Sequence, residues 1–289
     1  MVITKSDPLD WKDRAIRDLR WSIESPSLIT SKPSLLQETK SCDWESYKDP
    51  LAQFLGNPPQ HRVGKYFESL NQFWLEHICQ VKLIAQNYQV IEAGHTKGEI
   101  DFVFQTKNAE FIHWETAVKF YLYHATETSL DSHFIGPNTS DTFERKMDRL
   151  FNKQLPLGMK AFPQTTRHEA QVKGRIFYHP DQPRPIELPK HLAEHHHKGT
   201  WVKVCEWDKY IGTRPHEYFR ILRKPYWLSE ESLELEKLPE LQRRDAFKEE
   251  LTKHFNRSGH SLLVGAFRRD QNRLHESERL FVVESSWPK

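Results

Sequence analysis

The sequence contains no long hydrophobic run, and no apolar stretch approaches the roughly 18 residues needed to span a bilayer. Residues 1–11 contain no apolar segment of the kind found in secretory signal peptides. Cysteine is scarce: Cys42, Cys79 and Cys205 lie far apart and form no CxxC pair, which argues against a disulfide framework and against a thiol nucleophile. We therefore expect a soluble, cytoplasmic protein with no membrane partner.

Several motifs that would assign an enzyme class are also missing. The chain has no GxxxxGK[ST] phosphate loop, no GxGxxG fingerprint, no GxSxG elbow and no HExxH pair. These absences leave nucleotide triphosphatases, dinucleotide enzymes, serine hydrolases of the elbow type and zinc proteases without support. The formal net charge of +2, from 42 Lys+Arg and 40 Asp+Glu, neither favours nor excludes nucleic acid as a partner.

What the chain does contain is aromatic residues, with 9 Trp and 17 Phe among 289 residues of which 37% are hydrophobic. A disordered chain would be poor in aromatics, so a folded core with aromatic anchors is expected. The length corresponds to about two domains, or to one domain with large additions. We expect a helical or irregular N-terminal extension at 1–60, a compact core at 61–180 and a C-terminal extension packed on that core at 181–289.

The segment 61–180 predicts an α/β unit with a mixed sheet and flanking helices. Apolar side chains at three- and four-residue spacing indicate its first helix, and alternating or continuous apolar runs indicate strands. Asp141 and Glu144 have the spacing of a capping box, which predicts a second helix ending near Leu155. The other elements expected here are a helix at 63–78 and strands at 88–92, 99–105, 111–123 and 174–179.

The C-terminal extension predicts fewer regular elements. Residues 181–200 are rich in proline and histidine and predict a loop. His191 and His195–His197 do not predict a zinc site, because adjacent histidines cannot all face one ion and no cysteine lies nearby. Beyond the loop we expect a strand at 201–206, a charged helix at about 238–255 and hairpin-like strands at 261–268 and 279–284.

Carboxylates and a lysine share one face of the predicted strands. Successive side chains of a strand point to opposite faces, so Glu115 and Lys119 lie on the same face, about 13 Å apart along the strand. The apolar residues of this strand occupy its other face. In the preceding strand, Asp101 lies opposite the apolar set. If the two strands pair with their apolar faces aligned, Asp101 lies beside Glu115 and Lys119.

This cluster has the chemistry of a metal-dependent phosphodiesterase. Two or three carboxylates supply the oxygen ligands that Mg²⁺ or Mn²⁺ prefers. The ion polarises a scissile phosphate and lowers the pKa of an attacking water, and a nearby lysine stabilises the developing negative charge. The alternative interpretation is a solvated salt-bridge face, against which the aromatic neighbours Trp114, Phe120 and Tyr121 indicate a strand deep in the fold.

The run Gly98-Glu-Ile-Asp101, followed by His113-Trp-Glu115 and Lys119, resembles the signature of the restriction-endonuclease-like PD-(D/E)XK phosphodiesterases. The helix carrying Gly64-Lys-Tyr-Phe-Glu68 resembles the recombination-exonuclease branch of that superfamily. Over nearly its full length the chain is similar to bacterial proteins grouped as domain of unknown function 1853. The stretches that carry this second resemblance are His61–Glu68, His113–Leu122, Phe134–Asn138 and Phe281–Pro288.

The superfamily resemblance implies a fold and a set of roles. It implies a restriction-endonuclease-like core, in which a mixed β-sheet is flanked by helices, with an N-terminal helical and a C-terminal α+β extension. Asp101 would be the central metal ligand, Glu115 the second ligand and Lys119 the catalytic lysine, with Glu68 supporting the metal through water. The chain departs from the pattern at Ala117, where the superfamily has its second carboxylate; Glu115 lies one pleat further away on the same face.

The helix after the third strand adds further candidates. Gln154 shares one helix face with apolar residues and so points towards the sheet, and exonuclease-like members place a Gln from a comparable helix near the active site. A buried structural amide is an equally good interpretation of Gln154. The adjoining basic face could hold a phosphate backbone or could be solvated surface, and it comprises Arg145, Lys146, Arg149 and Lys153.

The sequence therefore predicts a Mg²⁺- or Mn²⁺-dependent nuclease that acts on DNA more readily than on RNA. The residues at its centre would be Glu68, Asp101, Glu115, Lys119 and Gln154. Ala117 motivates the alternative, a catalytically inactive module of the same fold that binds nucleic acid or protein.

Overall fold

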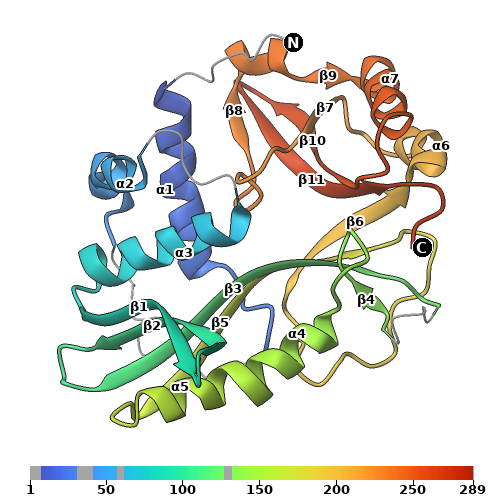
Figure 1. Cartoon of the computed structure of the whole chain (residues 1–289). Coiled ribbons are helices and arrows are strands. Elements are labelled where there is room, and N and C mark those ends of the chain that lie inside the picture. Colours follow the sequence, from blue (N-terminus) through green and yellow to red (C-terminus); the bar gives the residue numbers. More distant parts are fainter. Residues whose placement is uncertain (1–7, 31–41, 57–61, 127–131, 289) are drawn as a thin grey trace.

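The computed structural model describes residues 8–30, 42–56, 62–126 and 132–288, and these form one 11-stranded mixed sheet flanked by helices (Figure 1). The strands are β1 (Lys82–Glu92), β2 (His95–Gln105), β3 (Phe111–Tyr123), β4 (Phe134–Ile135), β5 (Arg167–Tyr178), β6 (His197–Lys203), β7 (Tyr218–Ile221), β8 (Ser232–Glu234), β9 (Gln242–Arg243), β10 (Leu262–Asp270) and β11 (Arg273–Val283). The α-helices are α1 (Pro8–Glu24), α2 (Lys48–Leu55), α3 (Val63–Phe73), α4 (Phe143–Arg149), α5 (Leu155–Ala161), α6 (Trp207–Gly212) and α7 (Arg244–Phe255). Shorter helical turns are 3₁₀ at Trp44–Tyr47, Val204–Glu206 and Leu235–Glu240, and π at Trp74–Ile78 and Leu150–Gln154.

The sheet is parallel in its middle and antiparallel towards both edges. Its order is β1-β2-β3-β5-β6-β11-β10-β7-β9, with β4 paired to β3 and β8 paired to β11. The parallel pairs are β3–β5, β5–β6 and β6–β11. The sheet thus passes through β6 from the strands of the predicted core into those of the predicted C-terminal extension, without a break. No described helix is long and apolar enough to cross a membrane.

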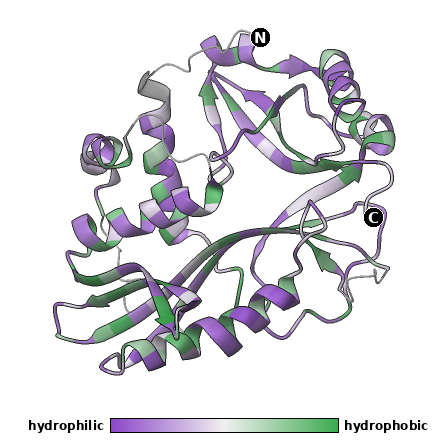
Figure 2. Cartoon of the chain, in the orientation of Figure 1, coloured by the Kyte–Doolittle hydropathy of each residue, from purple (hydrophilic) through white to green (hydrophobic). Residues whose placement is uncertain are grey.

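Helices cover both faces of the sheet at β3 and β5. Even-numbered residues of β3, such as Phe120 and Leu122, pack with α1 and α3, whereas the odd-numbered Tyr121 and Tyr123 pack with α4. Figure 1 shows α1 and α3 on one side of these strands and α4 and α5 on the other. In Figure 2 the central strands carry long hydrophobic stretches, while the helices alternate in colour as amphipathic elements do. The face that carries Glu115 is therefore covered by helices and is not a solvated surface.

Most of the predicted elements are present, with changed limits. The helix expected at 63–78 is confirmed as α3 and the π turn that continues it, and β3 has the limits expected from its pattern. The hairpin of β10 and β11 is also confirmed. Strands β1, β2 and β5 extend further towards the N-terminus than expected. The predicted turn before residue 61 lies outside the described residues.

Four of the expected limits were wrong. The residue that caps α4 is Thr142, whose hydroxyl accepts a hydrogen bond from the Arg145 amide, and Asp141 takes no part in a capping box. The helical segment that begins there continues through a π turn and α5 to Ala161, because Pro156 occupies an early position of α5 where its missing N–H is tolerated. The predicted charged helix at 238–255 begins only at Arg244, after a 3₁₀ turn that contains Pro239. The strand expected at 201–206 is β6, which runs from His197 to Lys203, so that residues 197–200 of the predicted loop belong to it.

A buried ionic network joins α1 to the C-terminal strands. Arg279, 2% exposed, donates to Glu276 and to the carbonyl oxygens of Trp227, Leu228 and Ser229. Arg14 of α1 pairs with Glu231, and Asp18 accepts hydrogen bonds from Ser229. Buried charges are tolerated only when they are paired in this way. The network fixes the segment 227–231 between the first helix and the last strand.

Two contacts with backbone atoms hold β5 in place. Lys173 donates to the carbonyl oxygens of Ile23 and Ser25 and so caps the C-terminus of α1. Burial lowers the pKa of Lys173 to about 8. The next residue, Gly174, has φ +143°, and a Cβ there would lie 1.7 Å from the Lys119 carbonyl oxygen. No residue other than glycine fits between these strands.

We expect Gly174→Ala to destabilise the protein by 3 kcal/mol or more, roughly, because the clash is with backbone atoms that cannot rotate away. Thermal unfolding followed by circular dichroism measures this effect. Gly64→Ala is the control: a Cβ at this exposed position of α3 meets nothing within 4 Å, and the substitution should stabilise by up to about 1 kcal/mol. Equal melting temperatures for the two variants would contradict the prediction.

Candidate active site

The candidate site lies where β2 and β3 separate. The two strands pair only from Phe102↔Trp114 to Gln105↔Phe111. Beyond this pairing β2 continues beside β1, and β3 continues beside β5. Asp101 and Glu115 are the first residues past the last pair, so their side chains occupy the fork between the diverging strands.

The structure brings these two carboxylates together in a buried environment. The Asp101 amide donates to Glu115 Oε1 at 3.4 Å, and the Thr116 amide donates to Asp101 Oδ2 at 2.8 Å. Asp101 is 9% exposed and Glu115 is 2% exposed. Asp101 Oδ1 receives no hydrogen bond from any described residue. One carboxylate oxygen thus remains available for a ligand.

Burial and mutual repulsion raise the pKa of Asp101 to about 7. Desolvation is the larger cause and the neighbouring Glu115 charge is the next; the Thr116 amide and the Lys146 ammonium act in the opposite direction. A carboxylate held in this state is more stable when it either keeps a proton or faces a cation. The fork is therefore a place where a positive charge is favoured.

Glu115 is held from two sides. His113 Nε2 lies 2.9 Å from its Oε1, and Gln154 Nε2 donates to its Oε2 at 2.9 Å. Because an ionised carboxylate only accepts hydrogen bonds, His113 donates through Nε2 when Glu115 is charged. His113 Nδ1 in turn lies 3.1 Å from Nδ1 of His168 on β5. These contacts fix both oxygens of Glu115.

Helix α5 covers this arrangement through a glycine. A Cβ at Gly158 would lie 2.1 Å from atoms of the His113 ring. The backbone of α5 therefore rests directly on the imidazole, which has no measurable exposure to solvent. The close approach needs a residue without a side chain, and it keeps water away from the His113–Glu115 hydrogen bond.

Glu68 lies at the edge of the cluster and forms its closest contact elsewhere. Its Oε2 accepts from Lys65 at 2.7 Å, and Lys65 also reaches Glu99 at 3.4 Å. Burial raises the pKa of Glu68, and the charges of Glu99 and Glu115 add to this effect. Its charge also raises the pKa of Asp101, so the two residues interact electrostatically. Within the described part of the chain, no three His, Cys, Asp or Glu side chains are grouped closely enough to hold a metal between them.

Lys119 pairs with a carboxylate other than Asp101 and Glu115. Its Nζ donates to Asp141 Oδ2 at 2.7 Å, in the turn before α4. The neighbouring residue on the same face, Ala117, packs among apolar side chains. The sequence pattern correctly placed Lys119 on the face of Glu115, but the structure gives its ammonium group a different carboxylate as partner.

The basic residues of the helical segment divide into two groups. Arg145, Arg149 and Lys153 are exposed. Lys146 is half-buried, and its Nζ donates to Gln154 Oε1 at 3.4 Å. Gln154 therefore links Lys146 to Glu115 as a bridging side chain.

Three residues of the site were not predicted as site residues from the sequence. Thr116 and His113 flank Glu115 in the same strand, and the two-residue period alone would have placed His113 beside Glu115. His168 gave no such signal, because its place depends on the parallel register His113↔His168 between β3 and β5. The histidines at 191 and 195–197 are not part of the site: His191 stacks on Phe151, and His196 contacts Tyr178.

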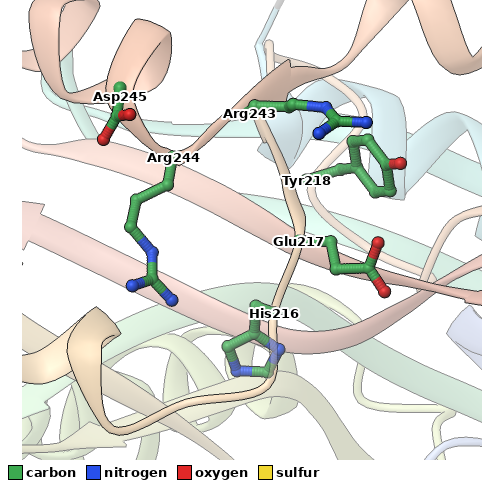
Figure 3. Close-up of a pocket in the computed structure, with 6 residues that line it drawn as sticks. All are labelled: His216, Glu217, Tyr218, Arg243, Arg244 and Asp245. Atoms are coloured by element: carbon green, nitrogen blue, oxygen red, sulfur yellow. The ribbon is translucent and has the colours of Figure 1, made fainter.

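A separate pocket of about 280 Å³ lies in the C-terminal part of the sheet (Figure 3). His216, Glu217 and Tyr218 line it from the β7 side, and Arg243, Arg244 and Asp245 line it from β9 and the start of α7. Its lining contains charges of both signs, and Arg244 donates to the Ile211 carbonyl oxygen. None of the residues that surround the carboxylate pair lines this pocket.

A comparison with protein families matches residues 17–283 to the family described as Domain of unknown function (DUF1853). Neither a search of curated proteins nor one of solved structures gives a match.

We expect Gly158→Ala to displace α5 or His113 and to destabilise the protein by about 1–3 kcal/mol, the usual cost of overpacking. The matched control is Gly212→Ala in α6, where a Cβ meets nothing within 4 Å. Chemical denaturation followed by tryptophan fluorescence measures both effects. A Gly158→Ala variant as stable as the control would show that the helix does not rest on the imidazole.

Asp101 makes the metal-free fold pH-dependent. Its pKa rises from an ordinary 3.8 to about 7, so the folded chain holds this proton more tightly than the unfolded chain does. The stabilisation is complete below pH 4 and is lost as the pH rises through about 7, by up to about 4 kcal/mol. Asp101→Asn cannot ionise, and it keeps an oxygen for the Thr116 amide. We expect the variant to become progressively more stable than wild type from pH 4 to pH 8 in urea titrations with EDTA; parallel pH profiles would contradict this.

Proposed function

We propose that this chain, which belongs to the DUF1853 family, is a metal-dependent nuclease whose ligands are Asp101 and Glu115. The observation that carries the proposal is the pair of adjacent buried carboxylates at the strand fork, with the pKa of Asp101 raised to about 7. The surrounding elements then correspond to a restriction-endonuclease-like core; they are the helices α3 and α4 and the strands β1–β3 and β5. The sequence resemblance to PD-(D/E)XK enzymes supports the same assignment.

The donor set fits Mg²⁺ or Mn²⁺. Mg²⁺ in proteins is usually held by one or two carboxylates and keeps several waters, so two carboxylates are enough. Oδ1 of Asp101 accepts no hydrogen bond from the described residues, and Glu115 is oriented by His113 and Gln154 in the way that supporting groups orient metal ligands. Glu68 would contribute through a water molecule. When bound, such an ion would polarise a phosphodiester and lower the pKa of a nearby water.

Nucleic acid is the substrate class that the surroundings favour. Arg145 and Arg149 on α4 and Lys153 in the following π turn are exposed, on the helical segment whose Gln154 contacts Glu115. Exposed arginine and lysine side chains bind the phosphate backbone without reading sequence. The resemblance to nucleases favours DNA over RNA.

Two observations favour a second candidate function. Ala117 replaces a carboxylate of the superfamily pattern, and Lys119 is paired with Asp141. A chain that kept this fold without its chemistry would bind nucleic acid through Arg145 and Arg149 and would not cleave it. Binding of this kind would weaken steeply with salt.

We expect the purified protein to cleave DNA in the presence of Mg²⁺ or Mn²⁺ and to stop when EDTA is added. Asp101→Asn should lower the rate by at least about 100-fold, because it removes the charge that holds the cation. Mn²⁺ should also raise the melting temperature of wild type and leave that of Asp101→Asn unchanged. Cleavage is followed with labelled single- and double-stranded oligonucleotides, and metal binding with thermal shift.

Asp49→Asn is the control for this experiment, because Asp49 is a surface carboxylate paired with Lys12 on the helices of the N-terminal segment. It should behave as wild type in both assays. A protein that binds DNA but shows neither cleavage nor a Mn²⁺-dependent shift would support the binding module. Cleavage that survives Asp101→Asn would refute the assigned metal site.

A further inference from the structure

The structure offers two lysines near the carboxylate pair, and they differ in what they face. Lys119 extends from β3 and ends at Asp141, 2.7 Å away. Asp141 also accepts from the Tyr121 hydroxyl at 3.4 Å. The ammonium group of Lys119 is thereby held at the connection between β4 and α4. Its removal would leave Asp141 without its cation but would not change a contact of Asp101 or Glu115.

Lys146, the fourth residue of α4, reaches the pair through Gln154. Its Nζ donates to Gln154 Oε1 at 3.4 Å, and Gln154 Nε2 donates to Glu115 Oε2 at 2.9 Å. The π turn Leu150–Gln154 widens the helix between the two residues. Lys146 and Gln154, eight residues apart, thus share the side that faces the sheet. One amide side chain then separates the ammonium group from the carboxylate.

The charges around Lys146 agree with this placement. It interacts favourably with the charges of Asp101 and Glu115, and unfavourably with those of Lys119 and Arg149. Its pKa is lowered, chiefly by burial. Lys146 therefore differs from the exposed Arg145, Arg149 and Lys153 with which its sequence pattern grouped it. A half-buried ammonium group that is linked to Glu115 through one amide side chain is placed to meet a phosphate that enters the fork.

We propose that Lys146, and not Lys119, is the lysine that contacts the reacting phosphate. The inference rests on the proposed nuclease function. In phosphodiester hydrolysis a water oxygen forms a bond to phosphorus and gives up a proton to the solvent, one P–O ester bond breaks, and the leaving alkoxide takes up a proton from the solvent to become an alcohol. Lys146 would remain protonated throughout and donate a hydrogen bond to a non-bridging phosphate oxygen. Its role is to stabilise the negative charge that grows there.

Four single substitutions test the inference: Lys146→Ala, Lys146→Arg, Lys119→Ala and, as a matched control, Lys153→Ala on the same helical segment. We expect Lys146→Ala to lower kcat for oligonucleotide cleavage by about 100-fold or more, the usual effect of removing one donor to a transition state. Lys146→Arg should recover part of that loss. Lys119→Ala should lower kcat by less than about tenfold, and Lys153→Ala should change mainly KM. Circular dichroism melting curves check that each variant folds.

A second measurement separates failure of this inference from failure of the nuclease function. Thymidine 5′-monophosphate resembles a product of phosphodiester cleavage, and its binding in the presence of Mn²⁺ can be measured by calorimetry without turnover. Lys146→Ala should weaken this binding at least about tenfold, and Lys119→Ala should leave it unchanged.

If cleavage is found but Lys119→Ala abolishes it while Lys146→Ala does not, the inference is wrong and the nuclease function stands. If wild type neither cleaves DNA nor binds the monophosphate with Mn²⁺, both are wrong. If wild type binds the monophosphate through Lys146 without cleaving DNA, the phosphate contact holds and the nuclease function fails.

Discussion

Two carboxylates held side by side out of water repel each other, and the structure around β2 and β3 is arranged to keep them there. Desolvation and the charge of Glu115 together raise the pKa of Asp101. The Thr116 amide, His113 and Gln154 compensate in part through hydrogen bonds. A fold retains such a pair at the expense of its own stability, and strain of this kind is concentrated at functional sites. The fork between the strands creates the space, because neither strand there has a neighbour on its inner edge.

The stability that tolerates this pair comes from the parallel centre of the sheet and from helices on both faces. Gly174 lets β5 approach β3 along its whole length, and Lys173 ties the same strand to the end of α1. On the other face, Gly158 lets α5 rest on His113. At Gly174 and Gly158, backbone atoms pack where a side chain would otherwise stand. At Lys173, backbone carbonyl oxygens hold the ammonium group. They position Glu115 through rigid elements, which keeps its oxygens in place more precisely than a loop would.

The two lysines near the carboxylate pair have different partners. Lys119 holds the turn before α4 through Asp141, and Lys146 lies near the carboxylates through Gln154. The exposed Arg145 and Arg149 continue from the same helix towards solvent. A phosphate chain lying along α4 would meet guanidinium groups first and the half-buried ammonium group at the fork. In the proposed function, this order of contacts would connect binding of a nucleic acid backbone to chemistry at Asp101 and Glu115.

The sequence by itself determined which residues could share a face. The two-residue period of β3 put Glu115 and Lys119 on one side, the alternation in β2 put Asp101 opposite its apolar neighbours, and the helical period turned Gln154 towards the sheet. These features are local, because side-chain direction follows directly from backbone geometry. Only the tertiary structure decided which charges meet. Asp141 was predicted to cap a helix and instead binds Lys119, Lys146 was grouped with surface arginines and instead turns inward, and His168 reaches the site through the β3–β5 register. The reason is that the partner of a charged side chain depends on which elements pack against it, and a local pattern does not specify that packing. The local pattern also did not specify the π turn Leu150–Gln154, which brings Gln154 to the side of Lys146.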